Sequence, residues 1–583
     1  MPNTTTWYKD IICLIIFFSV LFMLFLGGHH LISPDETRYV GIAWDMYKDN
    51  NYVTPTLAGS PFLGKPILYY WLEIISFHTF GVSEFSARFF PAVIGIITCL
   101  MTYVFGRLVF NRRMGIVASL MVAAAPMYFA LTHYTNMDGE VASWITCSML
   151  SFLIGVHHLK TNKHTATWFY LSYAFAALAF LTKGLIGLVF PAMIIFFWVL
   201  ILNDWRSLLK IRLLSGLILF VIIIAPWLYL CEQQNPGFLY YFFIWNQFFR
   251  FVGDDFNQQK AWFYYLPMVI GGIFPFVLYM LQSYGTHIKN IFVNKKSHPV
   301  ELFLLLWIVL ITLFFSIPSS KLVGYIGPVI PATAILMAIY VCRKWDEQPS
   351  KANRISTWVL IILLPLMAIT VISLAFIIPE QQGILASAPY ARFLGVLLLI
   401  TSAVLFYGIH KKKKFGFIIS ALLAMIFIMN VCLIASLKTW NLQWNWPIAE
   451  KVEHYLKSHP KAEVLMFGRY YYSVPMYLDR NVPAVAGWDE IDRATLPDNW
   501  QREIYEGLKY YEKSLPDTLM TYTVFKKDWK DSAHKTIIVI VDNGHLKEFE
   551  SLIGDHQYKI LANVPRRHVT IVTNNLQLKP TLQ

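Results

Sequence analysis

The segment that spans residues 33–73 contains the first side chains whose types and spacing could support chemistry. It begins with two adjacent acids, Asp35 and Glu36, and it later contains the pair Lys65-Pro66. A carboxylate can act as a general base or stabilise a developing positive charge. A lysine at the start of a helix can bind a phosphate, because the helix dipole favours an anion at that end. This segment is therefore the first candidate for a functional site.

The same residues also have a purely structural interpretation. Ser33 and Glu36 match the S-x-x-E capping box, followed by proline at the first helical position, which predicts a helix over 34–48. On this interpretation Glu36 caps the helix and Asp35 compensates its dipole. Lys65 precedes a second predicted helix, PILYYWLEIISFHTFG, and could equally contact lipid headgroups.

Three further segments place polar residues beside apolar runs. THYTNMDGE puts Asp138 and Glu140 at the start of a span, where a carboxylate is either functional or a helix cap. FFIWNQFFRFVGDDF contains Arg250, which needs an anion and could find one in the two aspartates that follow. SSKLVGY contains Lys321 and Tyr325, which share a face if that turn is helical.

Composition indicates a membrane protein. Of the 583 residues, 56% are hydrophobic and 14% are charged, whereas a soluble domain has about 25% charged residues. Repeated apolar runs of about twenty residues indicate transmembrane helices. The net charge of +13 then reflects basic loops more than binding to nucleic acid. None of the six cysteines has C-x-x-C spacing, so neither a disulfide framework nor a zinc site is indicated.

Apolar periodicity predicts thirteen transmembrane helices. The first run lacks a small-residue cleavage site and is expected to be a retained helix. The two runs around Lys183-Gly184 could also be one broken helix. The predicted spans are 11–27, 87–109, 115–131, 139–157, 167–181, 184–202, 213–231, 264–282, 300–317, 326–342, 356–378, 393–409 and 416–436.

The basic loops predict how these helices are oriented. The lysine- and arginine-rich connections all fall on one side, which the positive-inside rule makes cytoplasmic together with the N-terminus. The loops at 28–86, 132–138, 232–263 and 319–325 then lie outside. The candidate residues therefore share the outer side and could converge in one cavity that suits a phosphate-bearing, partly lipid substrate. They are Asp35, Lys65, Asp138, Arg250, Lys321 and Tyr325.

The chain after residue 437 differs in character from the rest. Apolar runs become shorter and charges occur throughout. TIIVIV at 536–541 and HVTIVT at 568–573 are typical of buried strands, and 447–458 and 499–513 have helical periodicity. We expect a membrane domain over 1–436, with loop helices at 28–86, and a soluble α/β domain over 437–583.

The polar residues occur in an order that resembles a known family. An acidic pair follows the first span, and G-x-P-F-x-x-K-P follows in the same loop. M-D precedes the fourth span, Q-x-x-R-F follows the seventh span, and S-K-L-x-x-Y comes late in the membrane part. The order is similar to that of the bacterial polyprenyl-phosphate-sugar glycosyltransferases of the C superfamily (GT-C). Within it, the chain resembles the lipid A 4-amino-4-deoxy-L-arabinose transferases, near the protein O-mannosyltransferases, over its whole length.

The resemblance implies a fold, a donor and an acceptor. The fold is an α-helical polytopic GT-C membrane protein of about thirteen spans with a periplasmic α/β tail, located in the bacterial inner membrane. The donor is a sugar on undecaprenyl phosphate, and the acceptor is a periplasmic glycolipid, typically a lipid A phosphate. The resemblance also implies that Asp35 is the essential active-site carboxylate and that Asp138 is a second important one. The residues implied to bind substrate are Glu36, Lys65, Arg250, Lys321 and Tyr325.

The role of Asp35 depends on the acceptor. A phosphate acceptor is largely ionised near neutral pH, so Asp35 would position substrate or offset the positive charge on the sugar. A hydroxyl acceptor would need Asp35 as a general base. No cofactor and no nucleic-acid partner is expected.

The sequence departs from the family pattern at two positions, and two rival functions stay open. Gly64 stands where the aminoarabinose enzymes often have an acid, which weakens the case for a metal bound there, and Val323 stands where proline is common. Both leave a hexosamine or a neutral hexose open as the sugar. A protein O-mannosyltransferase-like enzyme is one rival, and a transporter is the other. The transporter is disfavoured because the polar residues gather on one side and no inverted repeat is evident.

Overall fold

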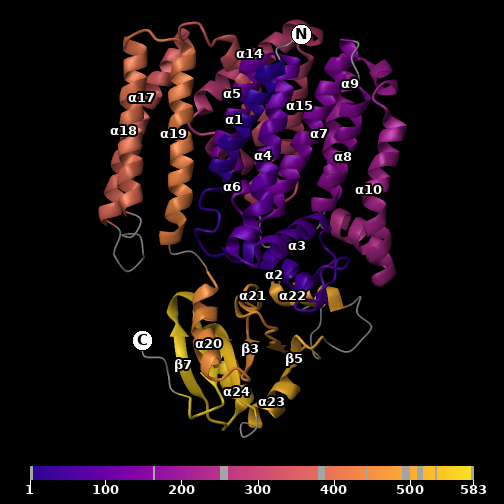
Figure 1. The fold of residues 1–583 in the computed structure, drawn as a ribbon, viewed down its shortest axis with the longest axis vertical. Coiled ribbons are helices and arrows are strands. Elements are labelled where there is room, and N and C mark those ends of the chain that lie inside the picture. Colours follow the sequence, from indigo (N-terminus) through magenta and orange to yellow (C-terminus); the bar gives the residue numbers. More distant parts are fainter. Residues whose placement is uncertain are drawn as a thin grey trace. The chain divides into compact units, whose positions relative to one another are not determined.

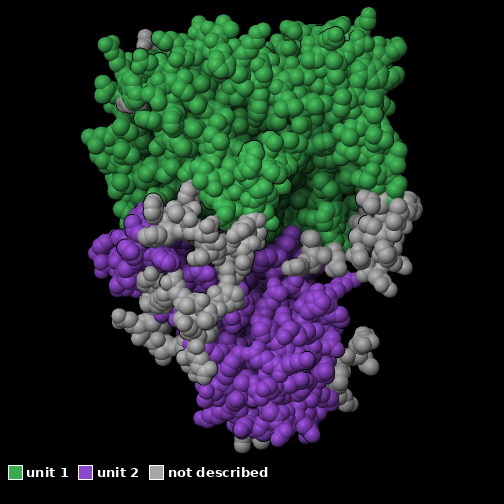
Figure 2. Space-filling model, turned by 180° about the vertical axis from the view of Figure 1, so that it is seen from behind, with its two compact units in different colours: residues 1–29, 88–226, 251–441 green, residues 30–87, 227–250, 442–583 purple. Residues whose placement is uncertain are grey.

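The computed structural model describes residues 4–161, 165–249, 260–377, 388–440, 444–488, 499–508, 516–531 and 535–578. The chain divides into two compact units, coloured separately in Figure 2. Unit 1 comprises residues 1–29, 88–226 and 251–441, and unit 2 comprises residues 30–87, 227–250 and 442–583. Helices α4 and α10 contribute residues to both.

Unit 1 is a bundle of long apolar helices, drawn from indigo to orange in Figure 1. Helix lengths follow the apolar runs of the sequence, because a chain in hydrocarbon must satisfy its backbone hydrogen bonds internally. The helices are α1 (Thr4–Met23), α4 (Glu84–Val109), α5 (Arg112–Ala124), α6 (Pro126–Thr132), α7 (Met137–Lys160), α8 (Ala166–Lys183), α9 (Ile186–Leu202), α10 (Leu213–Gln234), α13 (Tyr265–Gly272), α14 (Val277–Asn294), α15 (Pro299–Ser316), α16 (Val329–Arg343), α17 (Lys351–Ile377), α18 (Ala388–His410) and α19 (Phe415–Ser436).

Each of the thirteen predicted spans coincides with one of these helices or with a bent pair. Among the described residues, nine helices are long and apolar enough to cross a membrane, or eleven if each bent pair counts as one span. The pairs are α5–α6, bent by 70°, and α13–α14, bent by 108°. The two remaining predictions are α8 and α9, of 18 and 17 residues. Gly184 separates them with a φ of +83°, so the broken stretch is two helices.

Helices α7 and α16 form the centre of unit 1. Nearly all of the apolar window of α7 is buried, whereas α1, α10 and α17 expose most of theirs. Small residues in α7 let neighbouring helices approach closely. At Gly155, for example, an added Cβ would lie 2.8 Å from the Phe169 ring of α8. Ser148 of α7 also donates a hydrogen bond to the Ser172 carbonyl of α8, at 2.8 Å.

Unit 2 is built from the first outer loop, a short segment after α10, and the tail. The loop supplies α2 (Asp35–Lys48), the hairpin β1 (Thr56–Leu57) and β2 (Ser60–Pro61), and α3 (Leu68–Phe80). The segment after α10 supplies α11 (Phe238–Tyr240) and a π-helix (Tyr241–Phe249). The tail supplies α20 (Trp446–Ser458), β3 (Glu463–Phe467), α21 (Val474–Leu478), β4 (Ala484–Ala486), α22 (Trp500–Leu508), β5 (Leu519–Thr521), α23 (Tyr522–Lys530), β6 (Ile537–Asp542), α24 (Leu546–Ile553), β7 (Lys559–Val564) and β8 (Val569–Thr573).

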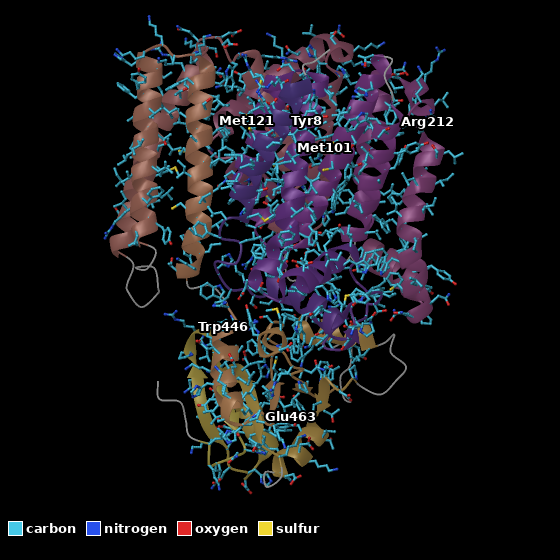
Figure 3. All side chains as sticks on the ribbon, in the orientation of Figure 1. Tyr8, Met101, Met121, Arg212, Trp446 and Glu463 are labelled. Carbon is cyan, nitrogen blue, oxygen red and sulfur yellow. The ribbon has the colours of Figure 1, made fainter. Side chains whose placement is uncertain are left out.

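The tail forms one six-stranded sheet in the order β5-β4-β3-β6-β8-β7. Strands β5, β4, β3 and β6 are parallel, and β8 and β7 complete the sheet in antiparallel pairing. Helices α23 and α24 pack an aromatic core of Phe525, Trp529 and Phe549 against β3 and β6. Figure 3 labels Trp446 at the start of α20 and Glu463 at the start of β3. The predicted strands at 536–541 and 568–573 and the predicted helix at 447–458 correspond to β6, β8 and α20. The predicted helix at 499–513 corresponds to α22 as far as Leu508, and its residues 509–513 lie outside the described residues.

The first outer loop packs against the tail within unit 2. Ser60 of β2 donates a hydrogen bond to the Ile504 carbonyl of α22, at 2.8 Å, and Thr518 donates one to the Ala58 carbonyl. Gly507 of α22 has no room for a side chain, because an added Cβ would lie 2.1 Å from the Pro61 carbonyl oxygen. These contacts place the loop at 30–87 in the same compact unit as the tail. The domain boundary at residue 437 stays a prediction.

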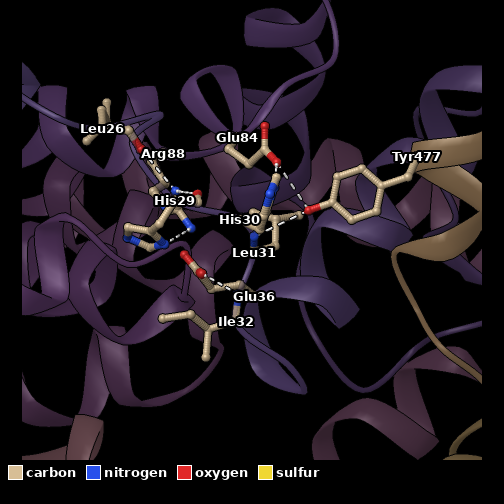
Figure 4. Close-up of polar contacts among 9 residues, drawn as sticks. All are labelled: Leu26, His29, His30, Leu31, Ile32, Glu36, Glu84, Arg88 and Tyr477. Atoms are coloured by element: carbon tan, nitrogen blue, oxygen red, sulfur yellow. Dashed lines mark hydrogen bonds and ion pairs between the residues drawn. The ribbon is translucent and has the colours of Figure 1, made fainter. Parts of the chain in front are cut away.

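The helix starts of the first loop differ from the sequence prediction. Helix α2 begins at Asp35, after an N-cap residue, Pro34, that makes no side-chain capping bond. Glu36 does reach back, but its Oε2 accepts from the backbone N–H of Ile32, at 2.8 Å, instead of Ser33 (Figure 4). The reciprocal capping box is therefore wrong, although the helix that it predicted exists. Helix α3 likewise begins at Leu68, three residues after Lys65.

The contact at Gly507 gives a test of how the loop and the tail are joined. We expect Gly507→Ala to lower the stability of unit 2 by roughly 1–3 kcal/mol, because the backbone of β2 must move to admit the methyl group. Thermal unfolding and limited proteolysis of the full chain in detergent would measure this. Gly285→Ala in α14, where an added Cβ meets nothing within 4 Å, is the matched control. Equal melting temperatures for the two variants would contradict the packing described.

Candidate active site

Asp138 is paired with a lysine in unit 1. It lies in the first turn of α7 and is 5% exposed, and its carboxylate forms an ion pair with the ammonium group of Lys183, the last residue of α8. The cap of α7 is Asn136, whose side chain accepts a hydrogen bond from the Asp138 N–H at 2.9 Å. The carboxylate of Asp138 is therefore not needed as a helix cap. The capping alternative raised by the sequence does not account for this side chain.

Tyr325 covers the same ion pair. The Lys183 Nζ lies 4.6 Å from the centre of the Tyr325 ring, a cation–π arrangement, and this ring packs on Phe315 at 5.1 Å. The backbone of Gly324 also approaches closely, since an added Cβ would lie 2.5 Å from the Asp138 carboxylate. The turn that contains Tyr325 is therefore in direct contact with Asp138 and Lys183.

Lys183 is a residue that the sequence analysis did not select. Its position between the apolar runs AFLT and GLIGL was a usable signal, because a charged side chain within a membrane segment is a functional-site candidate by default. Its partner, Asp138, lies 45 residues away in the sequence, and no local pattern links the two.

Lys321 bonds to backbone carbonyls instead of to this pair. Its Nζ donates hydrogen bonds to the carbonyls of Pro318 and of Lys260, the latter at 3.3 Å, and the side chain is 2% exposed. Burial lowers the pKa of Lys321. The 3₁₀ turn begins only at Val323, so Lys321 and Tyr325 do not share a helical face. Lys321 holds the turn in place, whereas Tyr325 contacts Lys183.

Asp35 belongs to a chain of charges in unit 2. Its Oδ1 lies 3.2 Å from the guanidinium group of Arg38, one turn later in α2, and 41% of its side chain is exposed. Arg38 also forms an ion pair with Glu503 of α22, and the Tyr472 hydroxyl donates to Glu503 at 3.0 Å. Arg38 therefore joins Asp35 to two residues of the tail. The tail residues Tyr472 and Glu503 were not selected from the sequence.

Burial shapes the ionisation of the groups around Asp35. Burial lowers the pKa of Arg38, but the nearby Glu503 carboxylate outweighs it and holds that pKa above its ordinary value. Burial, with Glu503, raises the pKa of Tyr472, so its hydroxyl keeps its proton. Farther along α2, burial raises the pKa of Asp45 to about 8, although the Ala58 N–H donates to its Oδ2 at 2.9 Å.

Lys65 lies in the half-buried loop between β2 and α3. The residue before it, Gly64, accepts a hydrogen bond through its carbonyl from the side-chain amide of Asn246, at 2.6 Å. Asn246 is part of the π-helix over Tyr241–Phe249, which ends just before Arg250 in the sequence. Arg250 itself lies outside the described residues. The structure thus connects the Lys65 loop to the segment that leads to Arg250.

Other buried polar groups hold the ends of helices, and of those described below only Glu36 was selected from the sequence. The Glu36 carboxylate is fully buried, and its bond to Ile32 favours the structural interpretation of this residue. In unit 2, Glu84 Oε1 lies 2.8 Å from His30 Nδ1 and accepts from the Tyr477 hydroxyl at 3.3 Å (Figure 4). In unit 1, the fully buried Arg88 donates to the carbonyls of Leu26 and His29, at 3.0 and 2.9 Å, also in Figure 4.

Across the described ranges, no three His, Cys, Asp or Glu side chains are grouped to hold a metal ion.

Comparison with known proteins shows which family model, relatives and solved structure this chain is similar to. The family described as dolichyl-phosphate-mannose-protein mannosyltransferase matches residues 8–242. The undecaprenyl phosphate-alpha-4-amino-4-deoxy-L-arabinose arabinosyl transferase of Pectobacterium carotovorum is 26% identical over 416 residues, which is 70% of this chain and 72% of that protein. The enzyme of the same name from Pseudomonas savastanoi is 29% identical over 398 residues, 67% of this chain and 72% of that protein. The crystal structure of ArnT from Cupriavidus metallidurans bound to undecaprenyl phosphate superimposes with a TM-score of 0.81, at 22% identity and with complete coverage of both chains.

The chain is a membrane glycosyltransferase with the GT-C fold. The resemblance stated from the sequence, the fold class and the reaction class are confirmed. The structure shows which candidate residues lie together within each unit. In this glycosyltransferase Asp138, Lys183 and Tyr325 meet in unit 1, and Asp35, Arg38 and Glu503 meet in unit 2. The convergence of the two groups in one cavity stays a prediction.

The buried ion pair gives a test that is independent of substrate. We expect Asp138→Asn and Lys183→Gln each to destabilise the glycosyltransferase, because each leaves one buried charge without its partner. The double variant should be more stable than the sum of the two single effects, by roughly 1–3 kcal/mol. Thermal unfolding of all four proteins measures this coupling. The exposed pair Arg113 and Asp346, 2.5 Å apart, is the matched control, with an expected coupling below about 1 kcal/mol. Additive effects at Asp138 and Lys183 would contradict the pairing.

Proposed function

We propose that the enzyme transfers 4-amino-4-deoxy-L-arabinose from undecaprenyl phosphate to a phosphate of lipid A. The observation that carries this proposal is the similarity to relatives that are named for this donor and sugar, over about two thirds or more of each chain. The GT-C fold and the ion pairs at Asp138 and Asp35 support it. We place the enzyme in the bacterial inner membrane, with Asp35, Asp138 and the tail on the periplasmic side, on the basis of its basic loops.

The reaction breaks one bond and forms one. The bond between the anomeric carbon of the sugar and the oxygen of undecaprenyl phosphate breaks, and its electron pair leaves with the phosphate. An oxygen of the acceptor phosphate then forms the new bond to the anomeric carbon. The leaving phosphate gains one negative charge, which nearby cations stabilise. Lys65 and Arg250 are the residues that we assign to this phosphate.

The carboxylates act on the sugar side of the reaction. The anomeric carbon becomes positively charged in the transition state, as in glycoside cleavage. Asp35 is accessible, and Arg38 limits its side-chain rotamers, so it is placed to offset this charge or to orient the acceptor. A lipid A phosphate is largely ionised near neutral pH and needs no general base. Asp138, paired with Lys183 and covered by Tyr325, shapes the polar wall of the site, and Lys321 supports that turn.

A second acceptor class has one observation in its favour. The matching family at residues 8–242 is named for mannosyl transfer to protein. A protein acceptor would be attacked through a hydroxyl, and Asp35 would then serve as the general base. The two acceptors predict different pH–rate profiles as well as different products.

The proposed reaction can be tested in cells whose chromosomal gene for this protein is deleted and which carry the gene on a plasmid. The lipid A of these cells is analysed. With the wild-type copy, mass spectrometry should show lipid A species heavier by one aminopentose residue, with the sugar on a phosphate. Asp35→Asn should reduce transfer by a factor of about 10²–10⁴, because a charge that acts only in the transition state is removed. Asp49→Asn, at the exposed C-terminal end of the same helix, is the matched control.

Three results would contradict the proposal. A wild-type amount of product with Asp35→Asn would leave Asp35 as only a first-turn acid of α2. A different added mass would overturn the assigned sugar. No transfer by purified enzyme in vesicles with any tested donor, together with flux of a solute, would favour a transporter.

The assignment of Lys65 has its own test. We expect Lys65→Ala to raise the apparent KM for the undecaprenyl-linked donor by a factor of about 10–100, since one charge-assisted contact to phosphate is lost. Donor titrations with radiolabelled sugar measure this value. Lys48→Ala, in the last turn of α2 and paired with Asp479 at 2.8 Å, is the control and should leave the KM unchanged. An unchanged KM for Lys65→Ala would remove Lys65 from the phosphate site.

A further inference from the structure

An apolar groove runs along α19 in unit 1, away from the residues assigned to catalysis. It consists of two hollows with volumes of about 930 and 570 Å³. Both are lined by Phe17 of α1 and by Phe427 and Ile428 of α19. The two phenylalanine rings meet edge to face at 5.1 Å, where the hollows join. The groove therefore lies between α1 and α19, on both sides of this aromatic contact.

The larger hollow is apolar along its length and basic at one end. Leu120 of α5 and Leu423 and Ala424 of α19 line its wall. Arg112 and Arg113, the first two residues of α5, and Trp345 lie at its end. Tryptophan and arginine are enriched where a membrane protein meets lipid headgroups. The smaller hollow has apolar residues such as Leu24, Phe393 and Val431.

Cations outnumber acids at this basic end. Arg112 and Arg107 share Asp10, whose oxygens lie 2.6 and 2.5 Å from their guanidinium nitrogens. Arg113 and Lys414 share Asp346, at 2.5 and 3.5 Å. These four cations thus face two carboxylates. Three of the four side chains are also about half exposed or more, at 59% for Arg112, 48% for Arg113 and 65% for Lys414.

Two helices begin at the same end. Helix α5 starts at Arg112, and α19 starts at Phe415, directly after Lys414. The N-terminus of a helix carries a partial positive charge, which adds to that of the side chains. An arginine has five N–H donors, so a guanidinium that binds one carboxylate can still bind a phosphate. The end of the groove is therefore suited to an anionic headgroup.

The dimensions of the larger hollow match one leaflet of a bilayer. Its lining on α19 extends from Ser420 to Ile428, which is about 12 Å along a helix. Half of the hydrocarbon core of a bilayer is about 15 Å thick. Helices α5 and α6 lie in the chain between Arg112 and the start of α7 at Met137, so Asp138, in the first turn of α7, is at the other end of these helices. A lipid whose phosphate sits at Arg113 is thus not placed for the chemistry at Asp138.

We propose that this groove binds one anionic diacyl phospholipid of the leaflet at the basic end. Its phosphate contacts Arg113 and Lys414, and one acyl chain lies along Leu120, Leu423 and Ala424. The lipid fills the space between α1, α5 and α19 and so fastens α19 to the rest of unit 1. The site does not depend on the transferred sugar or on the acceptor, and it stands if the proposed function fails.

Native mass spectrometry of the full-length enzyme in detergent tests this site. The probes are phosphatidylglycerol and phosphatidylethanolamine with identical acyl chains. The wild-type enzyme should retain one phosphatidylglycerol in preference to phosphatidylethanolamine. Ala424→Phe, which fills the hollow from an exposed position, should abolish this retention. Ala403→Phe, the same change at an exposed position of α18 outside the groove, should retain the lipid as the wild type does.

A second variant separates the headgroup from the acyl chain. Arg113→Gln should lower the retention of phosphatidylglycerol by about tenfold, because its phosphate loses a charge-assisted contact. The preference for phosphatidylglycerol over phosphatidylethanolamine should also fall, because the basic end loses one positive charge that favours a lipid with net negative charge. Equal retention of both lipids by the wild-type enzyme would overturn the proposal. Wild-type retention of phosphatidylglycerol by Ala424→Phe or Arg113→Gln would also overturn it. Displacement of phosphatidylglycerol by equimolar undecaprenyl phosphate would show that the occupant is the carrier lipid instead.

Discussion

A buried carboxylate at the end of a membrane helix is stable only when a cation neutralises it, and this constraint organises the centre of unit 1. Asp138 and Lys183 satisfy each other from the start of α7 and the end of α8, so those two helix ends must meet. Once the ammonium group is held there, the Tyr325 ring can lie over it, and the turn before α16 packs against the pair. The helices on either side are thereby brought to one place. Small residues along α7 make the close approach possible.

Unit 2 shows the same principle outside the apolar helices. Arg38 is mostly buried, and its charge is compatible with burial because Asp35 and Glu503 lie on either side. This arrangement makes the tail part of the environment of Asp35. It also gives the tail a physical role that its sequence did not indicate, since Glu503 and Tyr472 limit where Arg38, and through it Asp35, can lie.

Two sets of charges in unit 1 have different surroundings. Asp138 and Lys183 are enclosed by protein, and Tyr325 covers them. Arg112, Arg113 and Lys414 lie half exposed beside an apolar groove, where their pairing with acids leaves an excess of positive charge. An enclosed pair fixes the structure and shapes a reactive site. A half-exposed excess of charge beside apolar surface is available to the headgroup of a lipid.

The amino-acid sequence by itself determined where the membrane helices lie, the two helices of the first outer loop, and the strands β6 and β8. Those features follow from apolar runs, periodicity and turn residues, which are local signals along the chain. The motif order also identified the GT-C glycosyltransferases and selected Asp35 and Asp138. Only the tertiary structure decided what those acids contact. Lys183 is 45 residues from Asp138, and Glu503 is 465 residues from Arg38, so helix packing alone brings each pair together. Tertiary packing also turned Lys321 toward the backbone carbonyl of Lys260, 61 residues away, because a buried polar group bonds to whatever partner the fold places within reach.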